Sequence, residues 1–299
     1  MLKKIITGLK AVSIIVFAFG IYLIVTHYYN GNNSELTSAP AVPAMSSADE
    51  EENADLIKRG KELMIHTDTE LPENVGNTMS CISCHASGEE AGSINSLNLI
   101  GVSKTYPQFN VRDGKIVSLD ERINGCFVRS MNGKPLPEDS TELKAMVAYI
   151  DFISKNVPEK VKERDWALQK LEGDLPEPNI EEGEKLFNTA CISCHATDAA
   201  SENGLAVWGD DSYNDGAGMN RIRTIGAFIK NDMPKAQMGN IKPGSLTTEQ
   251  AVNLAAYINS HDRPFFKDKH KDYPGGQIPD DLMYEVDSMK DIKNKDNEK

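Results

Sequence analysis

The chain contains five cysteines, and four of them belong to two copies of the pattern Cys-x-x-Cys-His. The two copies comprise Cys81, Cys84, His85, Cys191, Cys194 and His195. In this pattern two thiols lie close enough to bond to the two vinyl groups of one haem, while the following histidine can ligate the iron. A zinc knuckle and a redox dithiol also use Cys-x-x-Cys. Because the histidine recurs at the same place, we predict two covalently bound haem c groups, with His85 and His195 as proximal ligands.

The residues that could complete the ligation of the second iron lie downstream of His195. Met233 follows at the distance usual for the distal ligand of a small cytochrome c, and Pro234 comes directly after it. Methionines more often serve only as packing residues. The alternative ligands are Met219, Met238 and Lys235. We predict Met233 as the distal ligand of the second haem.

Two residues could be the distal ligand of the first haem. Cys126, the fifth cysteine, stands where such a ligand is due after His85, and Met131 would instead give an ordinary His/Met haem. A free cysteine is most often a small buried hydrophobic residue. Outside the cytoplasm, however, a spare thiol is a liability unless the protein uses or protects it. These considerations and the residues around the thiol favour Cys126.

The two haem motifs stand in duplicated surroundings, which indicates two copies of one fold. Ala148-Tyr149-Ile150 in the first copy recurs as Ala256-Tyr257-Ile258 in the second. Apolar residues at helical spacing predict a helix before each motif, over residues 56–64 and 180–187. Two closing helices are also predicted, the first opened by Asp139 with Glu142 and the second by Thr247 with Gln250.

This order predicts a mainly α fold, in which two tandem class I cytochrome c-like domains follow an N-terminal transmembrane helix. Charged and proline-rich stretches predict the linkers between the parts. The predicted parts are a signal anchor or transmembrane helix at 1–26, a flexible linker at 27–53, cytochrome c domain 1 with the catalytic haem at 54–156, an interdomain linker at 157–179, cytochrome c domain 2 with the electron-transfer haem at 180–275 and a polar tail at 276–299.

The N-terminal prediction depends on the apolar run from Ile5 to Val25, which is long enough to cross a bilayer as a helix. Lys3 and Lys4 precede it and place the N-terminus in the cytoplasm. A cleaved signal peptide is the alternative, although the candidate cleavage site at residues 39–41 contains a proline. We therefore expect single-pass anchoring in the cytoplasmic membrane, with both haem domains on the periplasmic side.

The acidic composition excludes general affinity for nucleic acid. The formal net charge is −13 and the pI is about 5.0, so the overall field repels polyanions. A negatively charged substrate would need a local basic site. Arg112 and Arg122 lie near Cys126 in the sequence and could supply one, because a guanidinium is permanently charged and pairs two donors with an oxyanion. An exposed salt-bridge partner is the alternative for either arginine and for Arg129.

The residues around Cys126 read Arg122-Ile123-Asn124-Gly125-Cys126-Phe127-Val128-Arg129-Ser130-Met131-Asn132-Gly133. This string resembles the thiosulfate dehydrogenase family of dihaem cytochromes c, the tetrathionate-forming type. The segments 228–234 and 255–260 are similar to the second domain of that family. The resemblance extends over about residues 54 to 275.

This resemblance implies roles for particular residues. Cys126 would be the distal ligand of a catalytic first haem and also its reactive sulfur. Arg112, Arg122 and Ser130 would bind the substrate, and the second haem would pass electrons onward. Some members place a lysine ligand beside the second-haem methionine, whereas this chain has Asp232 there, which predicts permanent His/Met ligation.

The resemblance also implies the reaction. Joining two thiosulfates into tetrathionate releases two electrons, which two haems can hold, and the reverse reduction of tetrathionate would use the same site. A small cytochrome c or a membrane electron carrier would be the redox partner. The alternatives are a dihaem peroxidase and a non-catalytic dihaem cytochrome that carries electrons from membrane quinol oxidation to a terminal acceptor.

Overall fold

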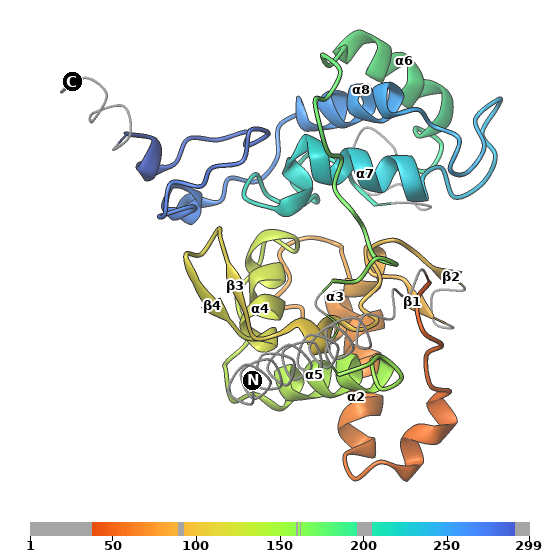
Figure 1. Cartoon of the computed structure of the whole chain (residues 1–299), viewed down its shortest axis with the longest axis vertical. Coiled ribbons are helices and arrows are strands. Elements are labelled where there is room, and N and C mark those ends of the chain that lie inside the picture. Colours follow the sequence, from red (N-terminus) through yellow and green to blue (C-terminus); the bar gives the residue numbers. More distant parts are fainter. Residues whose placement is uncertain (1–37, 89–92, 160, 162, 196–204, 291–299) are drawn as a thin grey trace, which may run out of the picture.

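The computed structural model describes residues 38–88, 93–159, 161, 163–195 and 205–290. These residues form two mainly helical domains, one above the other in Figure 1. The helices of the first domain and the segment leading into it are α2 (Ala54–Ile65), α3 (Thr67–Glu70), α4 (Leu119–Arg129), α5 (Thr141–Ile153) and 3₁₀ turns at Met45–Glu50, Cys81–Ser83 and Val102–Thr105. The second domain and the segment after it contain α6 (Ile180–Ala190), α7 (Ile222–Asp232), α8 (Thr248–Asn259) and 3₁₀ turns at Gly218–Asn220 and Lys267–Lys271.

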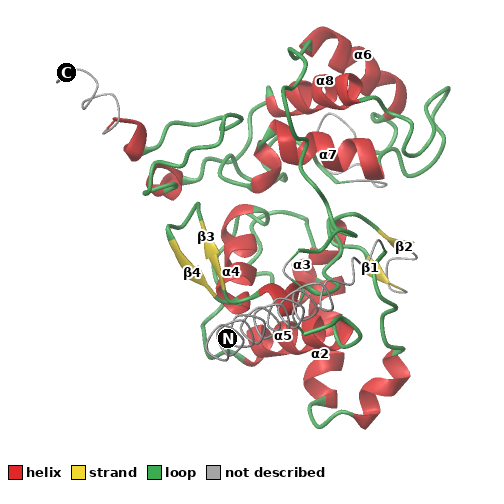
Figure 2. Cartoon of the chain, viewed as in Figure 1, coloured by secondary structure: helices red, strands yellow, loops and turns green. Residues whose placement is uncertain are grey.

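Strands contribute little to the described fold, as Figure 2 shows. Two short antiparallel hairpins belong to the first domain. They pair β1 (Ser87–Gly88) with β2 (Ser93–Ile94) and β3 (Gln108–Asn110) with β4 (Lys115–Val117). The predicted mainly α class with two domains is therefore confirmed.

The first and last helices of each domain cross in the same way, and a glycine makes both crossings possible. An added Cβ on Gly60 of α2 would lie 2.0 Å from the carbonyl oxygen of Ala145 in α5. An added Cβ on Gly183 of α6 would lie 2.2 Å from the carbonyl oxygen of Asn253 in α8. Two matching close approaches support the predicted duplication.

All four predicted helices are present, and of the two predicted helix caps one matches the structure and one differs. The predicted helices before the haem motifs are α2 and α6, and Thr247 opens α8 through a capping box with Gln250. Helix α5 instead begins after Ser140, whose hydroxyl accepts a hydrogen bond from the Leu143 N–H at 3.2 Å. The prediction that Asp139 caps this helix was wrong by one residue, because Ser140 has the extended backbone and the side-chain oxygen that a cap requires.

The segment between the domains is held by backbone hydrogen bonds on both sides. The Leu168 N–H donates to the carbonyl of Ser96 in the first domain at 2.6 Å. The Leu171 N–H donates to the carbonyl of Arg223 in the second domain at 3.1 Å. The stretch between these two bonds is thus a strap attached to both domains.

The segment after α8 returns to the first domain and lies beside the β3–β4 hairpin in Figure 1. Asp272 forms a bidentate ion pair with Arg129 of α4, at 2.7 and 3.0 Å. The Tyr273 N–H donates to the carbonyl of Arg112 at 2.8 Å. At the other end of the chain Ala48, which we expected in a flexible linker, is fully buried in the core of the first domain because an apolar stretch packs there.

The predicted membrane helix at residues 5–25 lies outside the described residues. Within the described ranges, no helix has the length and the apolar character needed to cross a bilayer. The longest of these helices, α5, has 13 residues, whereas a bilayer needs about 20. The predicted single-pass location in the cytoplasmic membrane is therefore not supported and is corrected here.

Candidate active site

Helix α4 carries the predicted reactive cysteine, and its sequence explains why the helix begins and lies where it does. Ser118 and Glu121 form a capping box, in which the Glu121 carboxylate accepts a hydrogen bond from the Ser118 N–H at 2.8 Å. Ile123 and Phe127, four residues apart, are buried in the core of the first domain. These two residues anchor α4 in the core, and the helix also lines a cavity.

Arg122, Cys126 and Ser130 are spaced by four residues, so the helical repeat places them along one face. All three line the same cavity. The Arg122 Nη1 atom donates a hydrogen bond to the Cys126 Sγ atom at 3.0 Å. A thiol that faces a guanidinium in this way is poised to ionise.

The surroundings of Cys126 favour its thiolate form. Burial is the largest single effect and opposes ionisation of the thiol, but the charges of Arg122 and His85 and their hydrogen bonds to the sulfur together outweigh it. The pKa of Cys126 is therefore lowered to about 6. The Cys126 thiolate in turn raises the pKa of Arg122. Together they form a charge-assisted pair in which the sulfur is a nucleophile near neutral pH.

The cavity has a volume of about 420 Å³ and is the place where a haem fits the first domain. Cys81, Cys84 and His85 line it together with Cys126. Much of the remaining lining is apolar and includes Leu99, Val102, Leu119, Ile123, Phe127 and Ile150. Two attachment thiols, an imidazole and a further thiol around one apolar cavity match the donor set of a haem c site. Met131 also lines this cavity, so both predicted candidates for the distal ligand face it.

Both predicted proximal histidines are oriented by a backbone carbonyl. The Nδ1 atom of His85 lies 2.6 Å from the carbonyl oxygen of Leu97, and that of His195 lies 2.8 Å from the carbonyl oxygen of Leu205. A carbonyl can only accept, so Nδ1 carries the proton in each case. The Nε2 lone pair is then free to bind iron.

Arg112 does not line the cavity that contains Cys126. It follows strand β3, donates to the Gly216 carbonyl at 3.1 Å, and lines a second cavity next to the first. Burial lowers the pKa of Arg112, as do the positive charges of Arg129 and Arg122. The structure thus brings Arg122, Cys126 and Ser130 together in one cavity and places Arg112 in the neighbouring cavity.

The contacts of Arg129 stabilise the fold. Arg129 forms the ion pair with Asp272, donates to the Gly216 carbonyl at 2.9 Å, and lies 4.4 Å above the centroid of the Phe266 ring. Its side chain is only 12% exposed. These contacts hold the C-terminal segment against α4.

The second haem site is described in part. Met233 directly follows α7 and is half-buried, while Cys194 is exposed. Residues 196–204, which follow the second haem motif, lie outside the described residues. Met219, one of the alternative ligands, lines the cavity of the first domain and also packs against the core of the second domain.

Several residues of the site were missed by the sequence reasoning. Arg164 and Lys170 line the first cavity, although both belong to the predicted interdomain linker. Arg164 donates to the carbonyls of Asn98 and Ile100, and burial lowers its pKa. Their only signal in the sequence is positive charge, which other residues of the same linker also carry, and their position depends on how the strap lies between the domains.

Comparison with known proteins identifies the relatives of this chain. Residues 73–158 match the family model "SoxA/TsdA, cytochrome c domain", and residues 178–258 match "Cytochrome C oxidase, cbb3-type, subunit III". The thiosulfate dehydrogenase of Psychrobacter arcticus is 37% identical over 262 residues, which cover 84% of this chain and 77% of the relative. The thiosulfate dehydrogenase of Allochromatium vinosum is 33% identical over 241 residues, which cover 78% and 87%.

A solved structure agrees with these relatives. The thiosulfate dehydrogenase (TsdBA) from Marichromatium purpuratum, in its as-isolated form, superposes with a TM-score of 0.67 at 26% sequence identity. The match covers 76% of this chain and 50% of the other, so this chain spans about half the length of that protein.

Two helical domains, each with a Cys-x-x-Cys-His motif and an oriented histidine, define a dihaem cytochrome c. The identity and coverage of the relatives make the assignment more specific, and the chain belongs to the thiosulfate dehydrogenase family. It is a haem c-dependent oxidoreductase with two covalently bound haem c groups.

Proposed function

We propose that this enzyme couples two thiosulfates to tetrathionate at the sulfur of Cys126. The observation that carries the proposal is the 3.0 Å hydrogen bond from Arg122 to a thiol that lines the haem cavity of the first domain. An ordinary buried cysteine has no such partner. The names of the relatives support the same substrate.

The residues that hold the two haems are assigned as follows. Cys81 and Cys84 would attach the first haem, and His85 and Cys126 would ligate its iron. Cys191 and Cys194 would attach the second, and His195 and Met233 would ligate its iron. Two haem c groups each accept one electron, so together they take up both electrons of the reaction. Residues 54–156 form the catalytic domain and residues 180–275 the electron-transfer domain.

The arginines solve an electrostatic problem. At about 4 Å two unit charges repel by roughly 4 kcal/mol at an effective dielectric constant of 20, so two dianions repel by about 16 kcal/mol. The net charge of −13 increases this cost. Arg122 neutralises part of it beside the reacting sulfur, and the hydroxyl of Ser130, which lines the same cavity, is a further donor to the sulfonate oxygens.

The chemistry at Cys126 proceeds in two balanced steps. The thiolate bonds to the outer sulfur of one thiosulfate with loss of two electrons, which forms a cysteine S-thiosulfonate. The outer sulfur of a second thiosulfate then attacks the sulfur bonded to Cys126. The new sulfur–sulfur bond completes tetrathionate, and the Cys126 thiolate leaves. The same steps in reverse describe tetrathionate reduction.

The electrons leave the protein through the second domain. Cys194 is exposed, so a haem attached there would lie close to the surface. A small cytochrome c or another electron carrier is the partner that this exposed edge suits. The first domain, in contrast, keeps its reactive sulfur inside a cavity.

The test is the variant Cys126→Gly in the haem-loaded enzyme. We expect tetrathionate formation to fall about 100-fold or more, since the nucleophile is gone. The signals of thiolate ligation in the low-spin spectrum of the oxidised first haem should disappear as well. Val128→Ala changes the same helix without touching the cavity and serves as the control. If Cys126→Gly remains fully active with both haems in place, Cys126 is not the nucleophile and the proposal is wrong.

A further inference from the structure

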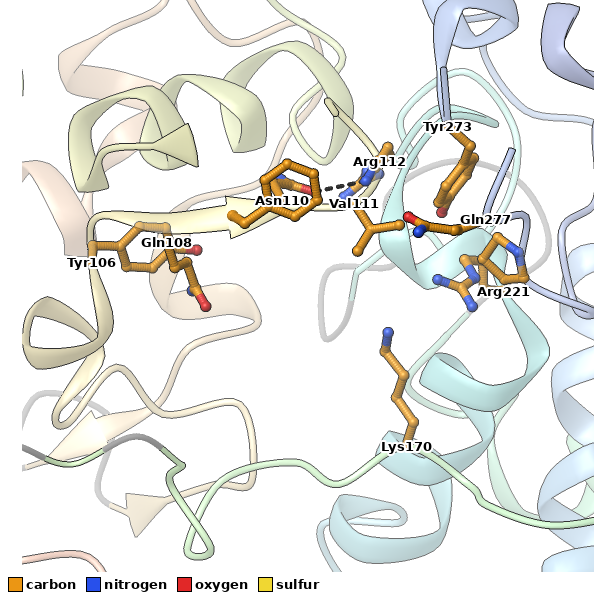
Figure 3. A pocket seen from close by; sticks show the side chains of 11 residues that line it. Tyr106, Gln108, Asn110, Val111, Arg112, Lys170, Arg221, Tyr273 and Gln277 are labelled. Carbon is orange, nitrogen blue, oxygen red and sulfur yellow. Dashed lines mark hydrogen bonds between the residues drawn. The ribbon is translucent and has the colours of Figure 1, made fainter. Parts of the chain in front are cut away.

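Next to the haem cavity lies an outer cavity of about 380 Å³ that is basic, although the protein is acidic. Three cations line it, namely Arg112, Lys170 and Arg221, and none of its lining residues is a carboxylate. Figure 3 shows Lys170 with its amino group directed into the cavity toward the side where Arg112 and Arg221 lie. Such an arrangement suits an anion.

The charges around this outer cavity are only partly compensated. Arg221 is paired with Asp281, at 2.5 and 2.9 Å. Arg112 donates to a backbone carbonyl, and Lys170 has no hydrogen bond or ion pair with any described residue. Removal from water lowers the pKa of Lys170, and Arg221 lowers it further. The site therefore holds two cations without a carboxylate within ion-pair distance.

The outer cavity adjoins the haem cavity. Tyr106, Gln108 and Lys170 line both of them, so the two spaces lie on either side of these side chains. Arg112 and Arg221 line only the outer one. An anion bound outside therefore lies next to the cavity that contains Cys126.

Four segments build the outer cavity, and the fold holds them in place. The β3–β4 hairpin supplies Arg112, the start of α7 supplies Arg221, the strap between the domains supplies Lys170, and the C-terminal segment supplies Tyr273 and Gln277. The strap is bonded to both domains on either side of Lys170, and Tyr273 is bonded to the backbone of Arg112. The three cations are thus brought together by contacts unrelated to the haem.

We infer that the outer cavity binds the sulfonate end of the second thiosulfate, and the corresponding end of tetrathionate, while the other end lies at Cys126. This inference rests on the proposed function. Thiosulfate must present its outer sulfur to the adduct with its sulfonate pointing away, and the sulfonate then needs cations beyond the haem cavity. Arg112 and Lys170 supply this charge, and the amide of Gln277 supplies a further donor.

A single-turnover experiment with the oxidised, haem-loaded enzyme tests this assignment. The enzyme is mixed with excess thiosulfate at a concentration that does not saturate the second step, and the Cys126 adduct is followed in quenched samples by mass spectrometry. In Lys170→Gln we expect the adduct to form as in the parent and to be consumed about tenfold more slowly, since one charged contact to the second thiosulfate is lost. Lys134→Gln, an exposed lysine that lines neither cavity, should behave like the parent.

Equilibrium binding gives an independent readout. In the haem-loaded Cys126→Ala background, which cannot form an adduct, calorimetry with tetrathionate should give a Kd about tenfold weaker after Lys170→Gln. An unchanged Kd overturns the inference. A changed potential of the first haem together with an unchanged Kd also overturns the inference, because Lys170 would then interact only with the carboxylates of the haem. If the parent enzyme forms no adduct, the mechanism at Cys126 fails, whereas the Kd still decides whether the outer cavity binds the anion.

Discussion

Asp232 and Ser96 connect the two haem sites. The Asp232 carboxylate accepts hydrogen bonds from the Ser96 N–H, at 3.0 Å, and from the Ser96 hydroxyl. Asp232 directly precedes Met233, and Ser96 directly precedes Leu97, whose carbonyl orients the imidazole of His85. The acidic residue at this position, which cannot ligate iron as a lysine would, thus links the loop of the predicted second distal ligand to the first proximal histidine.

The variant Asp232→Ala should weaken the contact between the domains. Two hydrogen bonds to a charged acceptor are lost and the Ser96 N–H is left without this partner, so we expect a loss of about 1–3 kcal/mol in the free energy of unfolding. Urea denaturation of the haem-loaded protein measures it. Asp232→Asn, which keeps one acceptor oxygen, should lose less, and Glu172→Ala on the exposed strap should lose nothing. Equal stability of all three variants would rule out this role.

Arg122 should set the pH dependence of the reaction. The thiolate of Cys126 is the reactive form, and its pKa of about 6 is depressed from the usual value of a thiol, so kcat/KM should fall only as the pH drops to about 6 or below. In Arg122→Gln the depressing charge is gone, so the acid limb should move to higher pH. The profile of kcat/KM against pH measures this shift, with Arg59→Gln as a control on the surface. A limb that stays in place would show that Arg122 does not control the thiol.

Gly60 and Gly183 should each be intolerant of a side chain. Alanine at either position would place a methyl group against a backbone carbonyl at the helix crossing, so the helices must move apart. We expect each Gly→Ala change to cost about 1–3 kcal/mol of stability, as overpacking usually does. Thermal unfolding measures the loss. Gly275→Ala is the matched control, because its nearest neighbour is 3.7 Å away; a similar loss there would contradict the steric explanation.

The ionised side chain of Glu121 should contribute a small part of the stability at neutral pH. Acid should remove this contribution. Lys115 and the Ser118 N–H hold the pKa of this carboxyl at about 2, below its unfolded value of 4.5. A depressed pKa means that the stabilisation is complete above pH 4.5 and is lost as the pH falls from there toward 2. Because the side chain is exposed to solvent, the effect should stay below about 1 kcal/mol.

The measurement compares Glu121→Gln with the parent protein in urea at pH 7 and at pH 3. The variant should be less stable at pH 7 and nearly equal to the parent at pH 3. Glu138→Gln, another exposed glutamate of the first domain, is the control. A constant difference between the two pH values would mean that the charge of Glu121 is not involved.

The sequence was sufficient for features that depend on neighbouring residues. The helices around each haem motif follow from apolar spacing, and the capping box of Thr247 follows from a four-residue pattern. The location of Lys170 and the separation of Arg112 from Cys126 were not predictable in this way. Both depend on the strap and the C-terminal segment folding back over the first domain, and no local pattern encodes that path.

The ion pair between Arg129 and Asp272 has a consequence for electron flow. Arg129 belongs to the first domain, whereas Asp272 lies beyond the last helix of the second, so the chain closes on itself around both haem sites. Separating the domains would strand a guanidinium and a carboxylate that are nearly inaccessible to water, which is costly. A domain arrangement that is fixed in this way would keep the distance between the two haem sites constant, so electron transfer between them would not need an encounter between mobile parts.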